Sequence, residues 1–279
     1  MQVGEIEITT FCPEHLAAAV RLSQEAGWPH RLEDWQVALE LSKGMVAIDE
    51  HGNVVGTVLV TLYERDCATI NMVIVDAAMR GRGLGRRLME AALAFGGERP
   101  LRLVATREGL PLYEKLGFRE AGTILQHQGI VAAVASPPNT EVAKAADLPA
   151  IIGLDRQAFG ADRSALMAKF FAIGEFAIIR RAGGIAGFSC IRPFGRGDVI
   201  GPVVASGFSD AGSLTSHFLS RRAGRFVRVD TIDGIGLGPW LADHALGHVG
   251  GGVSMMRPPV ARSDAPVART FALASQAFG

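Results

Sequence analysis

Three glycines at alternate positions, Gly81, Gly83 and Gly85, constrain this chain more than any other feature of its sequence. They follow an apolar, β-branched run at residues 70–75, which predicts a buried strand. After them, apolar residues recur at helical spacing as far as Phe95. Glycines between a strand and a helix let successive backbone N–H groups turn toward one point beside the helix N-terminus. The stretch therefore predicts a phosphate-binding loop; the alternative is a glycine-rich turn that only joins strand to helix.

Two common phosphate-binding patterns do not fit this loop. A dinucleotide fingerprint requires G-x-G-x-x-G and an acidic residue about twenty positions later. Here Arg86 follows Gly85, and the later region at 104–106 (VAT) holds no acidic residue. A P-loop requires G-x-x-x-x-G-K-[ST], which the chain lacks. The segment from Arg80 to Gly85 instead has the form R-x-x-G-x-G.

With Val73, Ile74 and Val75 before it, this segment resembles the acyl-CoA pyrophosphate loop of the GNAT superfamily of N-acetyltransferases. About thirty residues on, the segment 112–118 (LYEKLGF) resembles the second hallmark of that family, at the expected distance. The resemblance implies an α/β (α+β) fold with a mixed, mostly antiparallel twisted sheet flanked by helices. It also implies direct transfer, in a ternary complex, of an acetyl group from acetyl-CoA to an amine of a small molecule or a terminal amine. A non-catalytic acyl-CoA-binding sensor or scaffold with the same fold is the alternative.

The resemblance also assigns roles to individual residues. The backbone of Val73, Ile74 and Val75 would bind the pantetheine arm, and the Val75 amide would polarise the thioester carbonyl. The amides that would hold the pyrophosphate are those of Arg80, Gly81, Arg82, Gly83, Leu84, Gly85 and Arg86. Tyr113 would be the general acid; the alternative is an aromatic side chain that only packs at a helix start. No carboxylate stands where the family often has a general base, so a water held by Asn71, or an amine that arrives neutral, would take its place.

Residues 28–35 lie where this fold places its acceptor-binding helices. Trp28 and Trp35 with the two carboxylates of Glu33 and Asp34 are predicted to form a wall for a cationic acceptor, to which Asn71 would contribute. The alternative is that the aromatic side chains belong to the core and the carboxylates to a solvated helix face.

The chain predicts two similar lobes in tandem. Residues 136–139 (SPPN) interrupt every periodicity, so we expect a first domain at 1–136, a second at 140–258 and a tail at 259–279. Landmarks such as 116–118 (LGF) and 246–248 (LGH) recur 130 residues apart. The second copy lacks the arginine and the glycine spacing, and Asp243 stands in the place of Tyr113, so it is not expected to bind CoA in the same way. Residues 270–278 are predicted to form a short helix docked on either lobe.

Composition limits the remaining possibilities. The 28 basic and 28 acidic residues give a net charge of zero, which does not favour a nucleic-acid or membrane surface. Three cysteines far apart, without zinc spacing, predict neither disulfides nor a metal site. With no leader-like or 18-residue apolar segment, the chain is expected to be cytoplasmic. The sequence does not indicate an oligomeric state.

Overall fold

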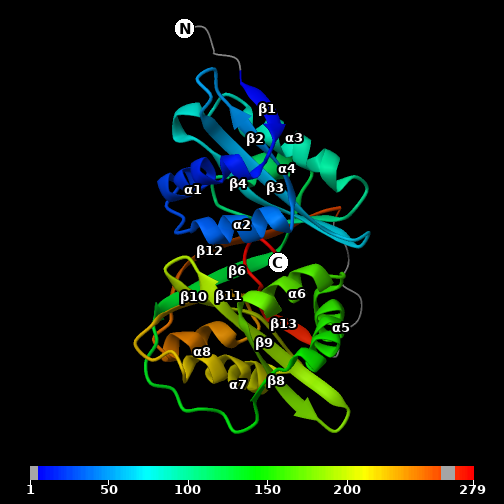
Figure 1. The fold of residues 1–279 in the computed structure, drawn as a ribbon, viewed down its shortest axis with the longest axis vertical. Coiled ribbons are helices and arrows are strands. Elements are labelled where there is room, and N and C mark those ends of the chain that lie inside the picture. The colour runs from blue at the N-terminus through cyan, green and yellow to red at the C-terminus, as the bar shows by residue number, and fades with distance from the viewer. Residues whose placement is uncertain (1–5, 259–267) are drawn as a thin grey trace.

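The computed structural model describes residues 6–258 and 268–279, which form two lobes joined by one sheet (Figure 1). Within these residues the sheet has thirteen strands in the order β1-β2-β3-β4-β5-β12-β6-β11-β13-β10-β9-β8-β7. The strands are β1 (Glu7–Thr10), β2 (Lys43–Ile48), β3 (Val54–Tyr63), β4 (Cys67–Val75), β5 (Leu101–Ala105), β6 (Arg119–Ile130), β7 (Glu141–Val142), β8 (Glu175–Arg181), β9 (Gly184–Phe194), β10 (Gly197–Ala205), β11 (Phe226–Ile232), β12 (Gly247–Arg257) and β13 (Arg269–Ala272). The α-helices are α1 (Leu16–Glu25), α2 (Leu32–Glu40), α3 (Leu84–Gly96), α4 (Leu110–Lys115), α5 (Leu148–Phe159), α6 (Ser164–Ile173), α7 (Phe208–Leu219) and α8 (Leu237–Asp243). This mixed sheet flanked by helices confirms the predicted α/β class.

In the N-terminal lobe, the strand predicted at 70–75 lies within β4, and the helix predicted after the glycines is α3. β2, β3 and β4 form an antiparallel meander because their connections are short. Leu84, Leu88 and Ala92, spaced at i, i+4 and i+8 on α3, are almost completely buried and pack on one face of this sheet. Helices α1 and α2 cover the other face (Figure 1).

The C-terminal lobe repeats this arrangement with β8, β9 and β10, followed by α7 and β11. A single hydrophobic core then continues from one lobe to the other. It includes Trp35 and Tyr63 from the first lobe, Ile151 and Phe170 from the second, and Phe278 from the C-terminal segment. Burial of this shared core opposes separation of the two lobes.

The lobes also exchange a strand with each other. β12 lies between β5 and β6 of the first lobe, where Met255 pairs with Leu103 on one side and Glu120 on the other. β6 in turn pairs with β11 of the second lobe over the whole length of β11, from Ile124 opposite Ile232 to Ile130 opposite Phe226. Figure 1 shows β6 and β12 crossing the middle of the molecule. The sheet is therefore continuous across the predicted boundary between domains.

The prediction of a helix at residues 270–278 is wrong. Residues 269–272 form β13, which pairs with β10 through Val203 and Val204 and with β11 through Thr231. Two open strand edges supply hydrogen-bond partners for this segment, and such tertiary pairing overrides the weak local preference of a sequence rich in alanine.

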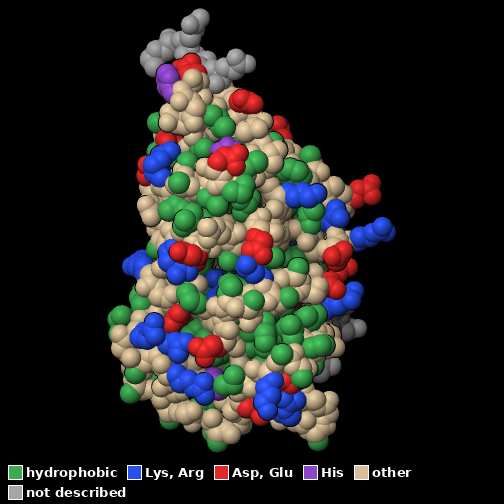
Figure 2. Space-filling model, viewed as in Figure 1, with side chains coloured by type: hydrophobic (Ala, Val, Ile, Leu, Met, Phe, Trp, Pro, Cys, Tyr) green, Lys and Arg blue, Asp and Glu red, His purple; other side chains and the backbone are tan. Residues whose placement is uncertain are grey.

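The visible surface carries interspersed basic and acidic side chains, in keeping with the zero net charge (Figure 2). Of the helices in the described ranges, none combines the length and the apolar character needed to cross a membrane.

Candidate active site

The glycine loop connects β4 to α3 in a conformation that requires glycine. Gly81 and Gly83 have φ angles of 75° and 77°, in the left-handed region that disfavours other residues. A Cβ atom at either position would meet no atom within 4 Å, so the backbone conformation rather than packing demands glycine there. Gly83 is the N-cap of α3, whose first amides have no partner within the helix. Together, these amides and the helix dipole form a site suited to an anion.

Gly85 has a different role from the other two glycines. A Cβ atom at Gly85 would lie 3.4 Å from the Leu112 side chain on α4. The small residue therefore lets α4 approach the beginning of α3. This contact brings the helix that carries Tyr113 beside the start of α3.

One edge of β4 has no strand partner along its second half. β4 and β5 pair only at Ala68 with Leu101 and at Thr69 with Arg102. The Asp76 amide donates a hydrogen bond to the Val55 carbonyl on β3. Because successive amides of a strand point in alternate directions, the Val75 and Val73 amides face away from β3. Among the described residues, no strand occupies that side beyond Thr69. The edge is thus available to an extended ligand.

A β-bulge interrupts β4 beside this edge. Met72 has a φ angle of 52°, the register with β3 shifts there, and the Met72 carbonyl accepts a 2.7 Å hydrogen bond from Thr57 Oγ1. The extra residue places the side chains of Asn71 and Met72 on the same face of the sheet, toward α1 and α2. Asn71 Nδ2 donates to Thr61 Oγ1 at 3.0 Å, while its Oδ1 has no partner in the described part of the chain.

Tyr113 lies on α4 and is buried, with its ring 6.2 Å from that of Phe118. Burial raises the pKa of its phenol to about 12. The hydroxyl therefore keeps its proton at neutral pH, which a proton donor requires. Its role as the general acid stays a prediction.

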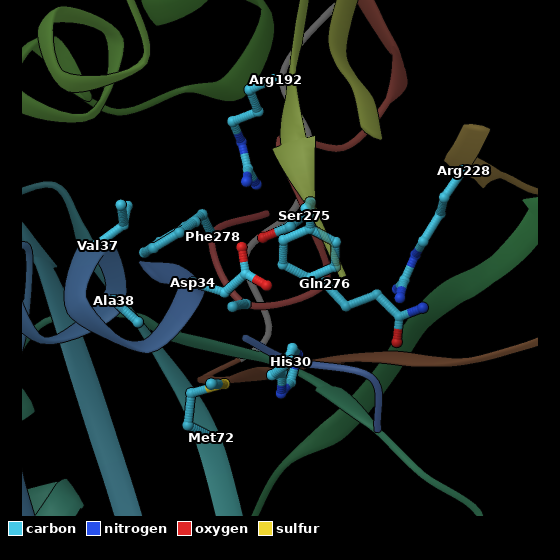
Figure 3. Close-up of a pocket in the computed structure, with 12 residues that line it drawn as sticks. His30, Asp34, Val37, Ala38, Met72, Arg192, Arg228, Ser275, Gln276 and Phe278 are labelled. Carbon is cyan, nitrogen blue, oxygen red and sulfur yellow. The ribbon is translucent and has the colours of Figure 1, made fainter. Parts of the chain in front are cut away.

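A pocket of about 40 Å³ lies between the lobes, next to the bulge in β4 (Figure 3). It is lined from α2 and the turn before it, from β4, β9 and β11, and from the C-terminal segment. The lining residues are His30, Asp34, Val37, Ala38, Met72, Arg192, Phe194, Arg228, Ser275, Gln276, Ala277 and Phe278. Because Met72 belongs both to the bulge and to this lining, the pocket adjoins the free edge of β4.

Three of the four side chains predicted between positions 28 and 35 do not line this pocket; the fourth, Asp34, does. Trp35 is fully buried in the core, where its Nε1 donates to Ser23 Oγ at 2.7 Å, so it does not form an exposed wall. Glu33 is exposed on the outer face of α2. Trp28 is partly buried, with its ring edge-on to that of His30 at 5.7 Å.

Asp34, one of the two carboxylates predicted for the wall, does line the pocket, whereas His30, which also lines it, was not predicted to contact the acceptor. Asp34 binds Arg31 at 2.7 Å and accepts a 3.0 Å hydrogen bond from the Gly195 amide of the second lobe. Arg31 and these hydrogen bonds outweigh the burial of Asp34 and hold the pKa of its carboxyl below the usual value. In the sequence, Asp34 lies three residues after Arg31, and an acidic residue at that spacing indicates the start of a helix.

The second lobe has no comparable free edge. β10 and β11 pair in parallel only at Asp198 with Val227 and Val199 with Arg228, as β4 and β5 do in the first lobe. Beyond this point β13 fills the gap between them. The second lobe therefore uses its own chain where the first lobe leaves a strand edge open.

Comparisons with known proteins agree with this architecture. A family model described as an acetyltransferase (GNAT) domain matches residues 41–120, and another with the same description matches residues 151–265. The protein named uncharacterized N-acetyltransferase YitH from Bacillus subtilis (strain 168) is 27% identical over 235 residues, which cover 80% of this chain and 81% of that protein.

Two solved structures show the same fold. A putative acetyltransferase from Pyrococcus horikoshii has a TM-score of 0.83 at 18% identity, covering 100% of this chain and 98% of its own. A tandem GNAT protein from the clavulanic acid biosynthesis pathway has a TM-score of 0.63 at 14% identity, covering 92% of this chain and 100% of its own. The tandem arrangement of two such lobes is thus found in another protein.

Proposed function

This chain belongs to the GNAT acetyltransferase superfamily, with two copies of the fold in tandem, and we propose that its first lobe transfers the acetyl group of acetyl-CoA to an amine. The amine is held in the pocket between the lobes. The second lobe supplies part of this pocket and binds no acetyl-CoA of its own.

The observation that carries this proposal is the unpaired half of β4, which leads from the glycine loop to the pocket. The loop amides from Arg80 to Arg86 bind the pyrophosphate of the coenzyme, helped by the positive side chains around them. The pantetheine arm adds to the free edge of β4 through the backbone of Val73 and Val75, as an extended peptide adds to a sheet. The acetyl group then reaches the bulge at Met72, beside the pocket.

The reaction joins the amine nitrogen to the thioester carbonyl carbon and releases CoA. A backbone amide at Val73–Val75 stabilises the negative charge that develops on the carbonyl oxygen. Tyr113, which burial keeps protonated, donates a proton to the departing thiolate. The described residues that line the pocket include one carboxylate, Asp34, which is already paired with Arg31, so we expect the amine to arrive neutral or to lose its proton to water.

Calorimetry with acetyl-CoA and two matched variants tests the binding site. Gly83 and Gly52 have φ angles of 77° and 80°, and a Cβ atom at either would meet no atom within 4 Å. Alanine therefore introduces a similar backbone strain at both positions, of about 1–2 kcal/mol. We expect Gly83→Ala to weaken acetyl-CoA binding about tenfold, because the loop amides move, and Gly52→Ala to leave it unchanged.

Equal affinities of the two variants would refute the loop as the binding site, and so would wild-type protein that releases no heat with acetyl-CoA. Release of the free CoA thiol in the presence of a panel of amines then measures the transfer itself.

A further inference from the structure

Three polar atoms without a partner converge on the pocket between the lobes. Eight buried side-chain nitrogen or oxygen atoms in the described residues have no hydrogen-bond partner. His30 Nδ1, Arg192 Nε and Ser275 Oγ are among them, and all three residues line this one pocket. Because an unpaired buried polar group is costly, such a concentration indicates a ligand that would satisfy these atoms.

Arg192 places a buried positive charge in this pocket. It extends from β9 of the second lobe into the pocket, as Figure 3 shows, and its side chain is 3% exposed. Its one hydrogen bond within the described chain runs from Nη2 to the Ala274 carbonyl at 3.3 Å, and no carboxylate lies within ion-pairing distance. The aromatic rings of Phe170 and Phe194 hold the guanidinium by cation–π contacts at 4.3 and 5.1 Å. The side chain is thus held in place without a counter-ion.

The other charges around the pocket compensate one another. Asp34 pairs with Arg31 at 2.7 Å, and Asp230 pairs with Arg228 at 3.0 Å. Among the residues that the structure describes, one positive charge, that of Arg192, then remains without a partner. A single planar carboxylate matches both this charge and the fork of the guanidinium, whereas a doubly charged phosphate would exceed it.

We propose that the acceptor is a small amine that carries a carboxylate, and that Arg192 binds this carboxylate and determines acceptor specificity. This inference rests on the proposed acetyl transfer. Ser275 Oγ donates a second hydrogen bond to the carboxylate. The amine end points toward the bulge at Met72, where neutral His30 accepts a hydrogen bond from the nitrogen through Nδ1. The acceptor therefore spans the two lobes, with its anionic end on the second and its reacting end on the first.

Matched acceptors test this proposal without altering the protein. The panel consists of the common amino acids and short ω-amino acids, each paired with its carboxamide, which removes the negative charge and keeps the amine. We expect at least one carboxylate member to bind in calorimetry and to release CoA from acetyl-CoA, with a KM at least tenfold below that of its carboxamide. A panel in which no carboxylate binds, or in which carboxylate and carboxamide perform equally, would overturn the proposal.

Variants then connect the preference to Arg192. In Arg192→Met we expect the carboxylate preference to disappear through KM, with the acetyl-CoA affinity unchanged. Arg192→Lys keeps the positive charge but not the planar fork of the guanidinium, so part of the preference for the carboxylate acceptor should remain. Arg196→Met, an exposed arginine on the same hairpin and outside the pocket, is the control. Two results would contradict the role of Arg192 in binding the carboxylate. One is weaker acetyl-CoA binding in Arg192→Met, and the other is a carboxylate preference in Arg192→Met as strong as in Arg196→Met.

This design separates the two proposals. Carboxylate binding is measured by calorimetry without acetyl-CoA, so it can succeed even if transfer is absent. Conversely, transfer to carboxamides as readily as to carboxylates would support the acetyltransferase and reject the role of Arg192.

Discussion

His30 makes the stability of this protein depend on pH in a way that can be calculated. Burial between the lobes lowers the pKa of its imidazole from 6.5 to about 4; the positive charges of Arg228 and Arg192 add to this effect, and Asp34 partly opposes it. In the unfolded chain, the same side chain binds its proton near pH 6.5. Above pH 7 the imidazole is neutral in both states and contributes no pH dependence.

The sign of the effect follows from proton binding. Between pH 6.5 and 4 the unfolded chain takes up a proton that the folded protein does not, so the free energy of unfolding falls as the pH falls. A pKa difference of about 2.5 at 1.36 kcal/mol per unit gives a total loss of about 3 kcal/mol, complete near pH 4. This is a large part of the stability of an ordinary domain.

Urea unfolding of the wild type and of His30→Gln between pH 8 and pH 4 measures this loss. Subtracting the two curves removes the titration of the carboxylates, and the difference should change by about 3 kcal/mol across that range. The control is His51→Gln, because the His51 side chain is 74% exposed and lies outside the pocket. A difference curve for His30 that stays flat, or an NMR titration of His30 with a midpoint near 6.5, would refute this reasoning.

Three further predictions concern other parts of the molecule. Tyr113→Phe should lower kcat by roughly 10²–10⁴-fold with little change in acetyl-CoA affinity, as general-acid loss predicts; unchanged kcat in stopped-flow or steady-state assays would remove Tyr113 from the mechanism. Calorimetry should give one acetyl-CoA per chain, because β13 fills the gap of the second lobe; a stoichiometry of two would disprove that interpretation. Asp155→Asn should lower the free energy of unfolding by about 3–5 kcal/mol, since it leaves the fully buried guanidinium of Arg163 without its carboxylate at 2.6 Å; a loss below 1 kcal/mol in urea unfolding would show that other groups compensate the charge.

The elements around the glycine loop could be predicted from the sequence because their signals are local. The strand at 67–75, the turn and the helix from Leu84 each follow from residues within a few positions of one another. Positive φ angles at Gly81 and Gly83 are a property of the turn itself. The bulge at Met72 gave no such signal, since it depends on the register with β3.

The side chains of the pocket could be predicted only in part. Residues 28–35 were expected near the acceptor because of where the fold places them. Aromatic and acidic character pointed to Trp28, Trp35, Glu33 and Asp34, of which only Asp34 lines the pocket. Which face of α2 meets the pocket is decided by the second lobe, whose Gly195 amide binds Asp34. A contact between residues 161 positions apart leaves no periodic trace in the sequence.

The strand exchange explains how the second lobe, in which β13 fills the gap between β10 and β11, can still form part of the candidate site. β12 is hydrogen-bonded to β5 and β6 of the first lobe, so moving the lobes apart would break two ladders and leave strand edges exposed. Arg192 on β9 and Arg228 on β11 are therefore held at a fixed position relative to the bulge at Met72, as a binding site for a small acceptor requires. The sheet in which β13 fills the gap of the second lobe thus also holds charged side chains in place beside the candidate site of the first lobe.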